Sequence, residues 1–135
     1  MKELFRYIYL LEAGDFKFPH CNCLVLEGEE KTCLIDSSPP DALYEYLKER
    51  KIDMIINSHG HFDHVSRSPD FNGSEIYLHK ADWPLVESPD GYLELFGFKA
   101  FPHPYTSHLL PAFGYRTFNP TGTLEEGQRF DLGTT

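Results

Sequence analysis

Short apolar runs separated by polar breaks open the chain and predict three strands. They cover residues 4–11, 22–27 and 31–36 and are rich in aromatic and branched side chains, which fit a pleated, half-buried surface. Only the polar residues 28–30 separate the second run from the third. A gap of that length predicts a hairpin between these two strands.

The next stretch changes from a strand-like to a helical period. Leu43, Tyr46 and Leu47 have the spacing of one buried helix face, so we expect a helix over residues 42–51 that begins after two prolines. The continuous apolar run at 52–57 is typical of a strand covered on both faces. Strand, helix and strand within about 30 residues predict a βαβ unit with parallel strands and a right-handed crossover.

Beyond residue 57 the pattern weakens. We expect a polar, turn-rich loop, then a short strand at 75–79 and a short helix within 80–87. Residues 88–122 carry prolines and aromatics without a clean period, and such long irregular segments are more often functional or partner-facing than idle. The tail predicts a turn followed by a strand that begins at Gln128. With 135 residues, the chain is about one domain of the α/β class.

Charge and the length of the apolar runs narrow the classes of partner. The chain has 12 Lys and Arg residues against 21 Asp and Glu residues, a net charge of −9. Such a surface repels phosphate backbones and anionic lipids, so we expect no nucleic-acid partner and no membrane partner. No apolar run approaches about 18 residues, and the first residues are typical of a strand rather than a signal peptide.

The chain has three cysteines, Cys21, Cys23 and Cys33, which are too few and odd in number for a disulfide framework. Cys21 and Cys23 are two residues apart, which places both on one face of a strand. Buried free thiols are the expectation, because free cysteine is among the most buried residue types. Free thiols persist in a reducing compartment, so we expect a cytoplasmic protein.

Potential metal ligands gather directly after the 52–57 strand, where the chain offers His59, His61, Asp63 and His64. His59 and His61 face the same way if the segment is extended and can bind one ion. The other two come as the chain turns and can face a second ion. Imidazole and carboxylate suit Zn²⁺, and Fe and Mn also accept them. A polar surface loop is the alternative, but the carboxyl end of a buried strand is where α/β sheets place ligands.

The motif His-x-His-x-Asp-His after an apolar strand resembles the signature of the metallo-β-lactamase superfamily, which includes glyoxalase II-like thioesterases, lactonases and β-lactamases. The early hairpin ending in Asp36, the following helix, and residues 75–86 also stand in the family's order. The resemblance implies an αββα four-layer sandwich. This chain would form the first αβ half of that sandwich and a connector, as a single partial domain.

Asp36 acquires a role from the same resemblance. It would be a structural residue that supports the metal loop, and the alternative is a turn residue before the helix. The family usually has a glycine soon after this Asp, where this chain has Ser37, Ser38 and Pro39. We therefore expect a different local turn.

The activity implied by the resemblance is metal-dependent hydrolysis. A hydroxide shared by one or two Zn²⁺ ions would attack an ester, thioester, lactone or similar acyl bond of a small molecule. His59 and His61 would hold one ion and Asp63 and His64 the other, and Asp63 would be the catalytic residue that orients the nucleophile. The acidic surface disfavours the nucleic-acid branch of the family, and the choice among the other substrates stays open.

Members of the family supply further ligands downstream, typically including a His in a Pro-Gly-His stretch, and this chain ends at Thr135 before such a stretch. A truncated chain and a naturally short relative are both open, and we expect weak or no hydrolase activity from these 135 residues. His103 and His108 could reach the site, although a surface or substrate-facing position is the default. A non-catalytic metal-binding half-domain, or an assembly partner, is the alternative function.

One face of the predicted sheet is expected to lack a cover. The 42–51 helix can cover only one side of the 52–57 strand, and soluble monomers rarely tolerate a large exposed apolar patch. A homodimer through this open sheet face is the expected solution, because one patch used twice closes the assembly. The competing outcome is that residues 88–122 fold back over the patch.

Overall fold

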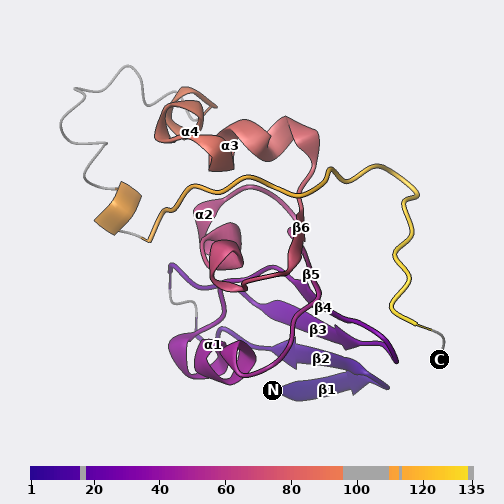
Figure 1. Cartoon of the computed structure of the whole chain (residues 1–135). Helices are drawn as coiled ribbons and strands as arrows, with labels where there is room; N and C mark the ends of the chain where they lie inside the picture. The colour runs from indigo at the N-terminus through magenta and orange to yellow at the C-terminus, as the bar shows by residue number, and fades with distance from the viewer. Residues whose placement is uncertain (16–17, 96–109, 113, 134–135) are drawn as a thin grey trace.

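A mixed β-sheet forms the centre of the protein. The computed structural model describes residues 1–15, 18–95, 110–112 and 114–133, and within this part of the chain the sheet has six strands in sequential order (Figure 1). They are β1 (Lys2–Phe5), β2 (Ile8–Leu11), β3 (Cys23–Glu27), β4 (Thr32–Ile35), β5 (Met54–Ile56) and β6 (Glu75–Tyr77). Strands β1 to β4 pair antiparallel, and β4, β5 and β6 pair parallel. The predicted hairpin and the parallel pairing of the βαβ unit are confirmed.

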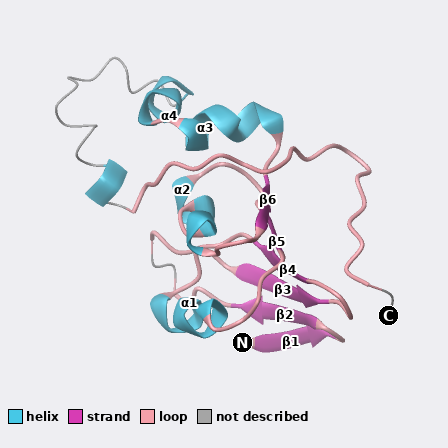
Figure 2. Ribbon diagram, viewed as in Figure 1, coloured by secondary structure: helices cyan, strands magenta, loops and turns pink. Residues whose placement is uncertain are grey.

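Short helices lie to one side of the sheet and beyond its last strand (Figure 2). They are α1 (Asp41–Lys48), α2 (Phe62–Val65), η1 (Ser68–Asp70), η2 (Lys80–Asp82), α3 (Trp83–Glu87) and α4 (Pro89–Leu95), where η denotes a 3-10 helix. Together η2 and α3 confirm the short helix predicted within residues 80–87. Among the described residues, no helix combines the length and the apolar character needed to cross a membrane.

The prediction of one strand over residues 4–11 is wrong, because two antiparallel strands take its place. Phe5 pairs with Ile8, so only Arg6 and Tyr7 form the turn between β1 and β2. Tyr7 has a φ of 67°, a left-handed conformation that tight hairpin turns use and that a bulky side chain rarely adopts. No Gly or Asn marks this turn, and the aromatic pattern runs through it.

Helix α1 packs on the sheet with a face that differs from the predicted one. Leu47 is fully buried, and Leu43 and Tyr44 pack against the core. The assignment of Tyr46 to this face is wrong, since it is 40% exposed and its ring lies 4.6 Å from the Arg50 guanidinium. Leu47 follows the other two core residues by four and three positions, which places all three on one side of the helix, and Tyr46 falls outside that side.

The main core lies between α1 and the sheet. Val25, Leu34 and Ile55 come from three neighbouring strands, expose no surface, and belong to one apolar cluster with Leu47. Burial of each such side chain contributes about 1.5–3 kcal/mol. The ends of β4 and β5 are therefore held by a packed core, which makes them a firm base for the loops that follow them.

The opposite face of the sheet is also apolar. Leu24, Ile35 and Ile56 lie in register across β3, β4 and β5, and each is half-buried. Because side chains alternate between the two faces of a strand, these residues point away from the face that carries Val25, Leu34 and Ile55.

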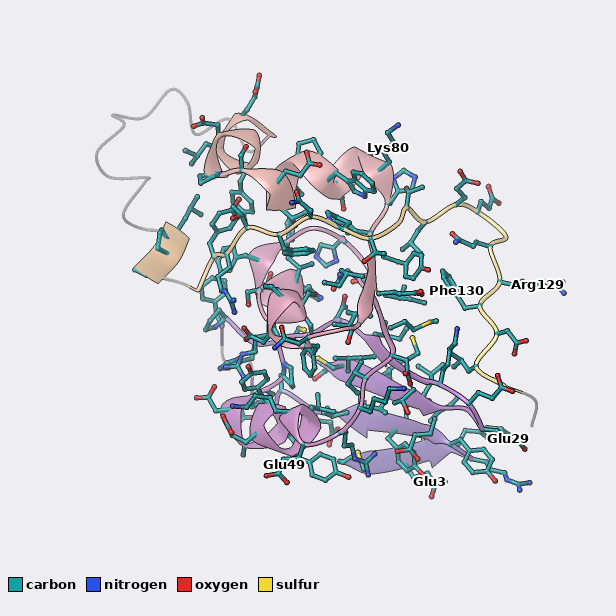
Figure 3. The ribbon with its side chains drawn as sticks, viewed as in Figure 1. Glu3, Glu29, Glu49, Lys80, Arg129 and Phe130 are labelled. Carbon is teal, nitrogen blue, oxygen red and sulfur yellow. The ribbon has the colours of Figure 1, made fainter. Side chains whose placement is uncertain are left out.

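The C-terminal segment descends on the side away from α1 (Figure 1). Phe130 of this segment is labelled in Figure 3. Its ring lies 4.9 Å from the ring of Tyr77. The carbonyl of Leu132 accepts hydrogen bonds from the backbone N–H groups of Glu30 and Lys31, at 3.0 and 3.1 Å. The predicted strand from Gln128 is wrong, because residues 128–133 follow the sheet without joining a strand ladder.

A second apolar cluster joins α2, α3 and α4 to the segment around residues 110–118. Its buried members are Phe62, Val65, Leu78, Leu85, Val86, Tyr92, Leu93, Leu110 and Tyr115. Phe118 packs against both this cluster and the main core. The described part of residues 88–122 thus packs on helices and on the main core, and it reaches the edge of the sheet, where Gly122 forms a parallel bridge with Tyr77 of β6.

Candidate metal centre

Two parallel strands bring the candidate site together at one edge of the sheet. Asp36 follows β4 directly, and the loop that begins at Ser58 follows β5. The backbone N–H of Asp36 donates to the carbonyl of Ile56 at 3.0 Å, so the two strand ends stay side by side up to the loop. Helix α2 begins within the loop, at Phe62. The carboxyl ends of parallel strands are where the fold class places binding sites.

Asp36 ties the two ends of the loop together. Its Oδ1 accepts the backbone N–H of Ser58 at 2.7 Å, and its Oδ2 accepts the Ser58 hydroxyl at 2.8 Å. The same Oδ2 lies 2.9 Å from Nδ1 of His64. Asp36 is 6% exposed and has a φ of 58°, which Asp tolerates better than most side chains. Asp36 lies in the turn before α1 and also contacts both ends of the loop. The two predicted roles, a turn residue and a residue that supports the loop, are therefore compatible.

Ser37 and Ser38, which follow Asp36, hydrogen-bond to α2 and to the residues after it. The backbone N–H of Ser37 donates to the carbonyl of His64 at 2.8 Å. The hydroxyls of Ser37 and Ser68 are 2.9 Å apart, and those of Ser38 and Ser66 are 3.0 Å apart. These buried contacts orient the short helix that carries two of the candidate ligands.

The four side chains predicted from the motif share one neighbourhood. The ring of His59 lies 4.6 Å from the ring of His61 and 4.1 Å from the ring of His64, centroid to centroid. Oδ2 of Asp63 lies 3.8 Å from Nε2 of His64. The spacing of the motif predicts that these side chains lie close together, and the role of the four residues as metal ligands stays a prediction.

Gly60 is required by a close approach of helix α3 to the loop. A Cβ at this position would lie 2.8 Å from Cδ1 of Leu85 and 3.1 Å from Cβ of Asp82. The Gly60 backbone N–H donates to Oδ2 of Asp82 at 2.9 Å. The loop is therefore held from the α3 side as well as from the Asp36 side.

Cys21 is a member of this site that the motif did not reveal. Its sulfur, a carboxylate oxygen of Asp36 and a ring nitrogen of His64 all lie within 4.8 Å of one another. Cys21 is 6% exposed, and all three cysteines are buried and free, as predicted. The register of the β3–β4 hairpin is the feature that could have indicated Cys21. Leu24 pairs with Ile35, so the residues just before β3 lie beside those just after β4.

Electrostatics differ among the three groups. The hydrogen bond to Asp36, followed by that to Cys21, raises the pKa of His64 to about 10. The hydrogen bond from the Cys23 thiol, together with His64, lowers the pKa of Cys21 to about 6 in spite of burial, and the same thiol pair raises the pKa of Cys23. Burial, followed by repulsion from His64 and His61, lowers the pKa of His59. The Cys21 thiolate, a protonated His64 and a neutral His59 are therefore the favoured forms in the absence of a cation.

This donor set fits a divalent cation. It combines imidazole, carboxylate and thiol groups, the ligand types that Zn²⁺ takes in proteins once they have lost their protons. Of the remaining histidines, His79 accepts the backbone N–H of Ala81 with its Nδ1 at 3.2 Å and starts η2. His103 and His108 lie outside the described residues, so the expectation for them stays open.

A family pattern and the solved structures point to the same family. The sequence pattern of the Metallo-beta-lactamase superfamily matches residues 17–133. No curated protein matches the chain. The fold is similar to an archaeal metallo-beta-lactamase superfamily protein from Sulfolobus tokodaii, at 25% identity and a TM-score of 0.60, over 93% of this chain and 51% of that one.

Two further solved structures are similar in fold. A metallo-beta-lactamase family protein from Thermus thermophilus is 22% identical with a TM-score of 0.67, over 96% of this chain and 49% of that one. BJP-1, a subclass B3 metallo-beta-lactamase of Bradyrhizobium japonicum, is 18% identical with a TM-score of 0.61, over 94% and 46%.

The chain spans about half the length of the structures it matches. Its mixed sheet and helices correspond to about half of the metallo-beta-lactamase fold, as the motif predicted. Because the family pattern covers most of its length, this chain belongs to the metallo-beta-lactamase superfamily.

Proposed function

We propose that this chain carries the first metal-binding loop of a metal-dependent hydrolase that cleaves ester, thioester, lactone or similar acyl bonds of small molecules. The observation that supports this most is the meeting of three imidazole rings at the end of β5. The His59 ring lies 4.6 Å from that of His61 and 4.1 Å from that of His64.

The proposed ligand assignment follows the chain. His59 and His61 hold one ion, and Asp63 and His64 hold a second, with Zn²⁺ the leading candidate and Fe and Mn as alternatives. Divalent ions bound in this way lower the pKa of a water molecule and polarise an acyl carbonyl. Nδ1 of His59 lies 2.9 Å from the Ser58 hydroxyl, and the neutral state that burial favours for His59 leaves one ring nitrogen without a proton and able to bind a cation.

The protein groups around the loop have orienting roles in this proposal. Asp36 accepts from Nδ1 of His64 at 2.9 Å, which turns the opposite nitrogen of the ring toward Asp63, 3.8 Å away. A carboxylate behind a ligating imidazole fixes the ring's orientation and raises its basicity. Asp63 is half-buried, so its second oxygen can accept a proton from an attacking water and orient it.

Charge and cysteine usage support the choice of substrate class and compartment. A net charge of −9 disfavours polyanionic substrates such as nucleic acids, so the proposal is a small acyl substrate. Three buried free thiols suit a reducing compartment such as the cytoplasm.

Equilibrium dialysis against Zn²⁺, with metal content measured by mass spectrometry, tests the ligand assignment. The unmodified chain should retain Zn²⁺, and His61→Ala should lose most of it. His79→Ala is the matched control, because His79 is an exposed histidine that lies outside the metal loop, at the start of η2. Equal retention by His61→Ala and the unmodified chain contradicts the proposal.

Hydrolysis provides a second measurement. Chromogenic thioester, lactone and ester substrates should be cleaved slowly, and a chelator should stop the reaction. Turnover that persists in His61→Ala after chelation would show that the loop does not carry the activity.

A further inference from the structure

Three donor groups from distant parts of the chain meet beside the histidine loop. Cys21 precedes β3, Asp36 follows β4, and His64 lies in α2. Their ligand atoms all lie within 4.8 Å of one another. The meeting is set by the sheet register and by the serine contacts that dock α2, because none of the three is a sequence neighbour of another.

The Cys21 sulfur lies where the apolar core meets polar groups. Cys21 is 6% exposed and belongs to the main core, and its sulfur also lies within 4.8 Å of an imidazole nitrogen and a carboxylate oxygen. The sulfur of Cys23 lies 3.7 Å away, so one thiol can donate to the other sulfur. The backbone N–H of Cys21 donates to the carbonyl of Ser38 at 2.9 Å, which holds the residue against the Asp36 turn.

His64 can offer one ring nitrogen to this site. Its Nδ1 lies 2.9 Å from Oδ2 of Asp36, and a cation bound here would take the place of the proton that Nδ1 donates to Asp36. The other nitrogen, Nε2, lies 3.8 Å from Oδ2 of Asp63 and would then carry the ring proton, so His64 binds either this ion or one on the Asp63 side. The histidine loop supplies nitrogen and oxygen donors on the Asp63 side. The Asp36 side adds sulfur, a soft donor that favours Zn²⁺ and Cd²⁺ over Mg²⁺ and Mn²⁺.

We propose that Cys21, Asp36 and His64 form a cation site in which the Cys21 sulfur binds the ion directly. The inference rests on the proposed function for the presence of a cation beside His64. It adds a sulfur ligand from outside the motif and predicts a preference for thiophilic ions. A thiolate, a carboxylate and an imidazole together supply two negative charges, which a divalent ion neutralises.

Cobalt substitution tests the proposal on the full, reduced chain. Titration with Co²⁺ alone should produce an intense near-ultraviolet band from sulfur-to-cobalt charge transfer, together with weaker visible bands. Cys21→Ser should lose the intense band. It should also bind Zn²⁺ on the order of 100-fold more weakly, because even the removal of a residue that only supports a metal ligand weakens binding by up to about that factor. Cys33→Ser is the matched control and should keep the band, since Cys33 is equally buried but lies in β4 away from the cluster.

The outcomes separate this inference from the proposed function. Visible cobalt bands without the charge-transfer band, or a charge-transfer band that survives in Cys21→Ser, overturn the sulfur ligand and leave the histidine loop standing. No cobalt binding at all overturns both. If Cys21→Ser does not fold, ¹¹³Cd NMR of the unmodified chain decides instead. A strongly downfield cadmium signal coupled to the Cys21 side-chain protons supports the site, and an upfield signal without that coupling overturns it.

Discussion

Nδ1 of His64 lies 2.9 Å from Oδ2 of Asp36, a residue 28 positions earlier in the chain. The contact joins the end of β4 to helix α2 and orients the imidazole that shares the loop with His59 and Asp63. Asp36 also accepts two hydrogen bonds from Ser58. One buried carboxylate therefore holds both ends of the candidate metal loop.

Replacing that carboxylate should weaken metal binding without unfolding the sheet. Asp36→Asn keeps the size of the side chain and one carbonyl oxygen for Ser58, but removes the charge that His64 contacts. We expect the Zn²⁺ affinity to fall by about 10–100-fold, as for other residues that orient a ligand. Competition with a fluorescent chelator measures the affinity, and Asp70→Asn, outside the loop, is the control. An unchanged affinity would contradict the supporting role of Asp36.

Gly60→Ala should disturb the packing of the loop on α3. The new methyl group would lie 2.8 Å from Cδ1 of Leu85 and 3.1 Å from Cβ of Asp82, so α3 or the loop must move. Overpacking of this kind costs about 1–3 kcal/mol. Urea unfolding followed by circular dichroism measures the loss, and a midpoint equal to that of the unmodified chain would show that the contact is not tight.

The pH dependence of stability should include a contribution from Asp53. Its Oδ1 lies 2.7 Å from Nζ of Lys51, and its Oδ2 accepts the backbone N–H of Thr32 at 2.9 Å. The hydrogen bond to Lys51, followed by that to Thr32, lowers the pKa of Asp53. The stabilisation is therefore present above the unfolded-state pKa of about 3.9 and is lost as the pH falls through the lower folded-state value.

Asp53→Asn isolates this contribution. At pH 7 the variant should be less stable than the unmodified chain by on the order of 1 kcal/mol, since the Thr32 bond loses its charged acceptor and the exposed Lys51 pair adds little. The difference should shrink when both proteins are unfolded in urea near pH 2. A difference that stays constant between the two pH values would assign the effect to packing instead of charge.

We propose that the apolar sheet face opposite α1 mediates a homodimer. Leu24, Ile35 and Ile56 lie in register there and are half-buried within the chain. Size-exclusion chromatography with light scattering at micromolar concentration should give about twice the chain mass of 15.6 kDa. Leu24→Glu should return the protein to a monomer, whereas Tyr46→Glu, on the exposed side of α1, should not. A monodisperse mass near 15.6 kDa for the unmodified chain rejects the dimer.

Much of the local structure could be predicted because it depends on short-range pattern. The β3–β4 hairpin, the helix after the two prolines and the buried strand before the histidines all follow from residue spacing. The errors occur where that pattern is ambiguous. Aromatic residues run through the Tyr7 turn, Tyr44 and Tyr46 compete for one helix face, and the tail after Gln128 lies beside the sheet without joining it.

The sequence by itself determined which donors the loop offers, because His59, His61, Asp63 and His64 fall within six residues and their spacing limits how far apart they can lie. Only the tertiary structure decided which other residues contact these donors. Asp36 reaches His64 because β4 and β5 pair in parallel, and Cys21 reaches both because β3 pairs antiparallel with β4. Contacts across such separations depend on strand register and helix docking, which arise from burying the sheet against α1 and are not encoded in any local run of residues.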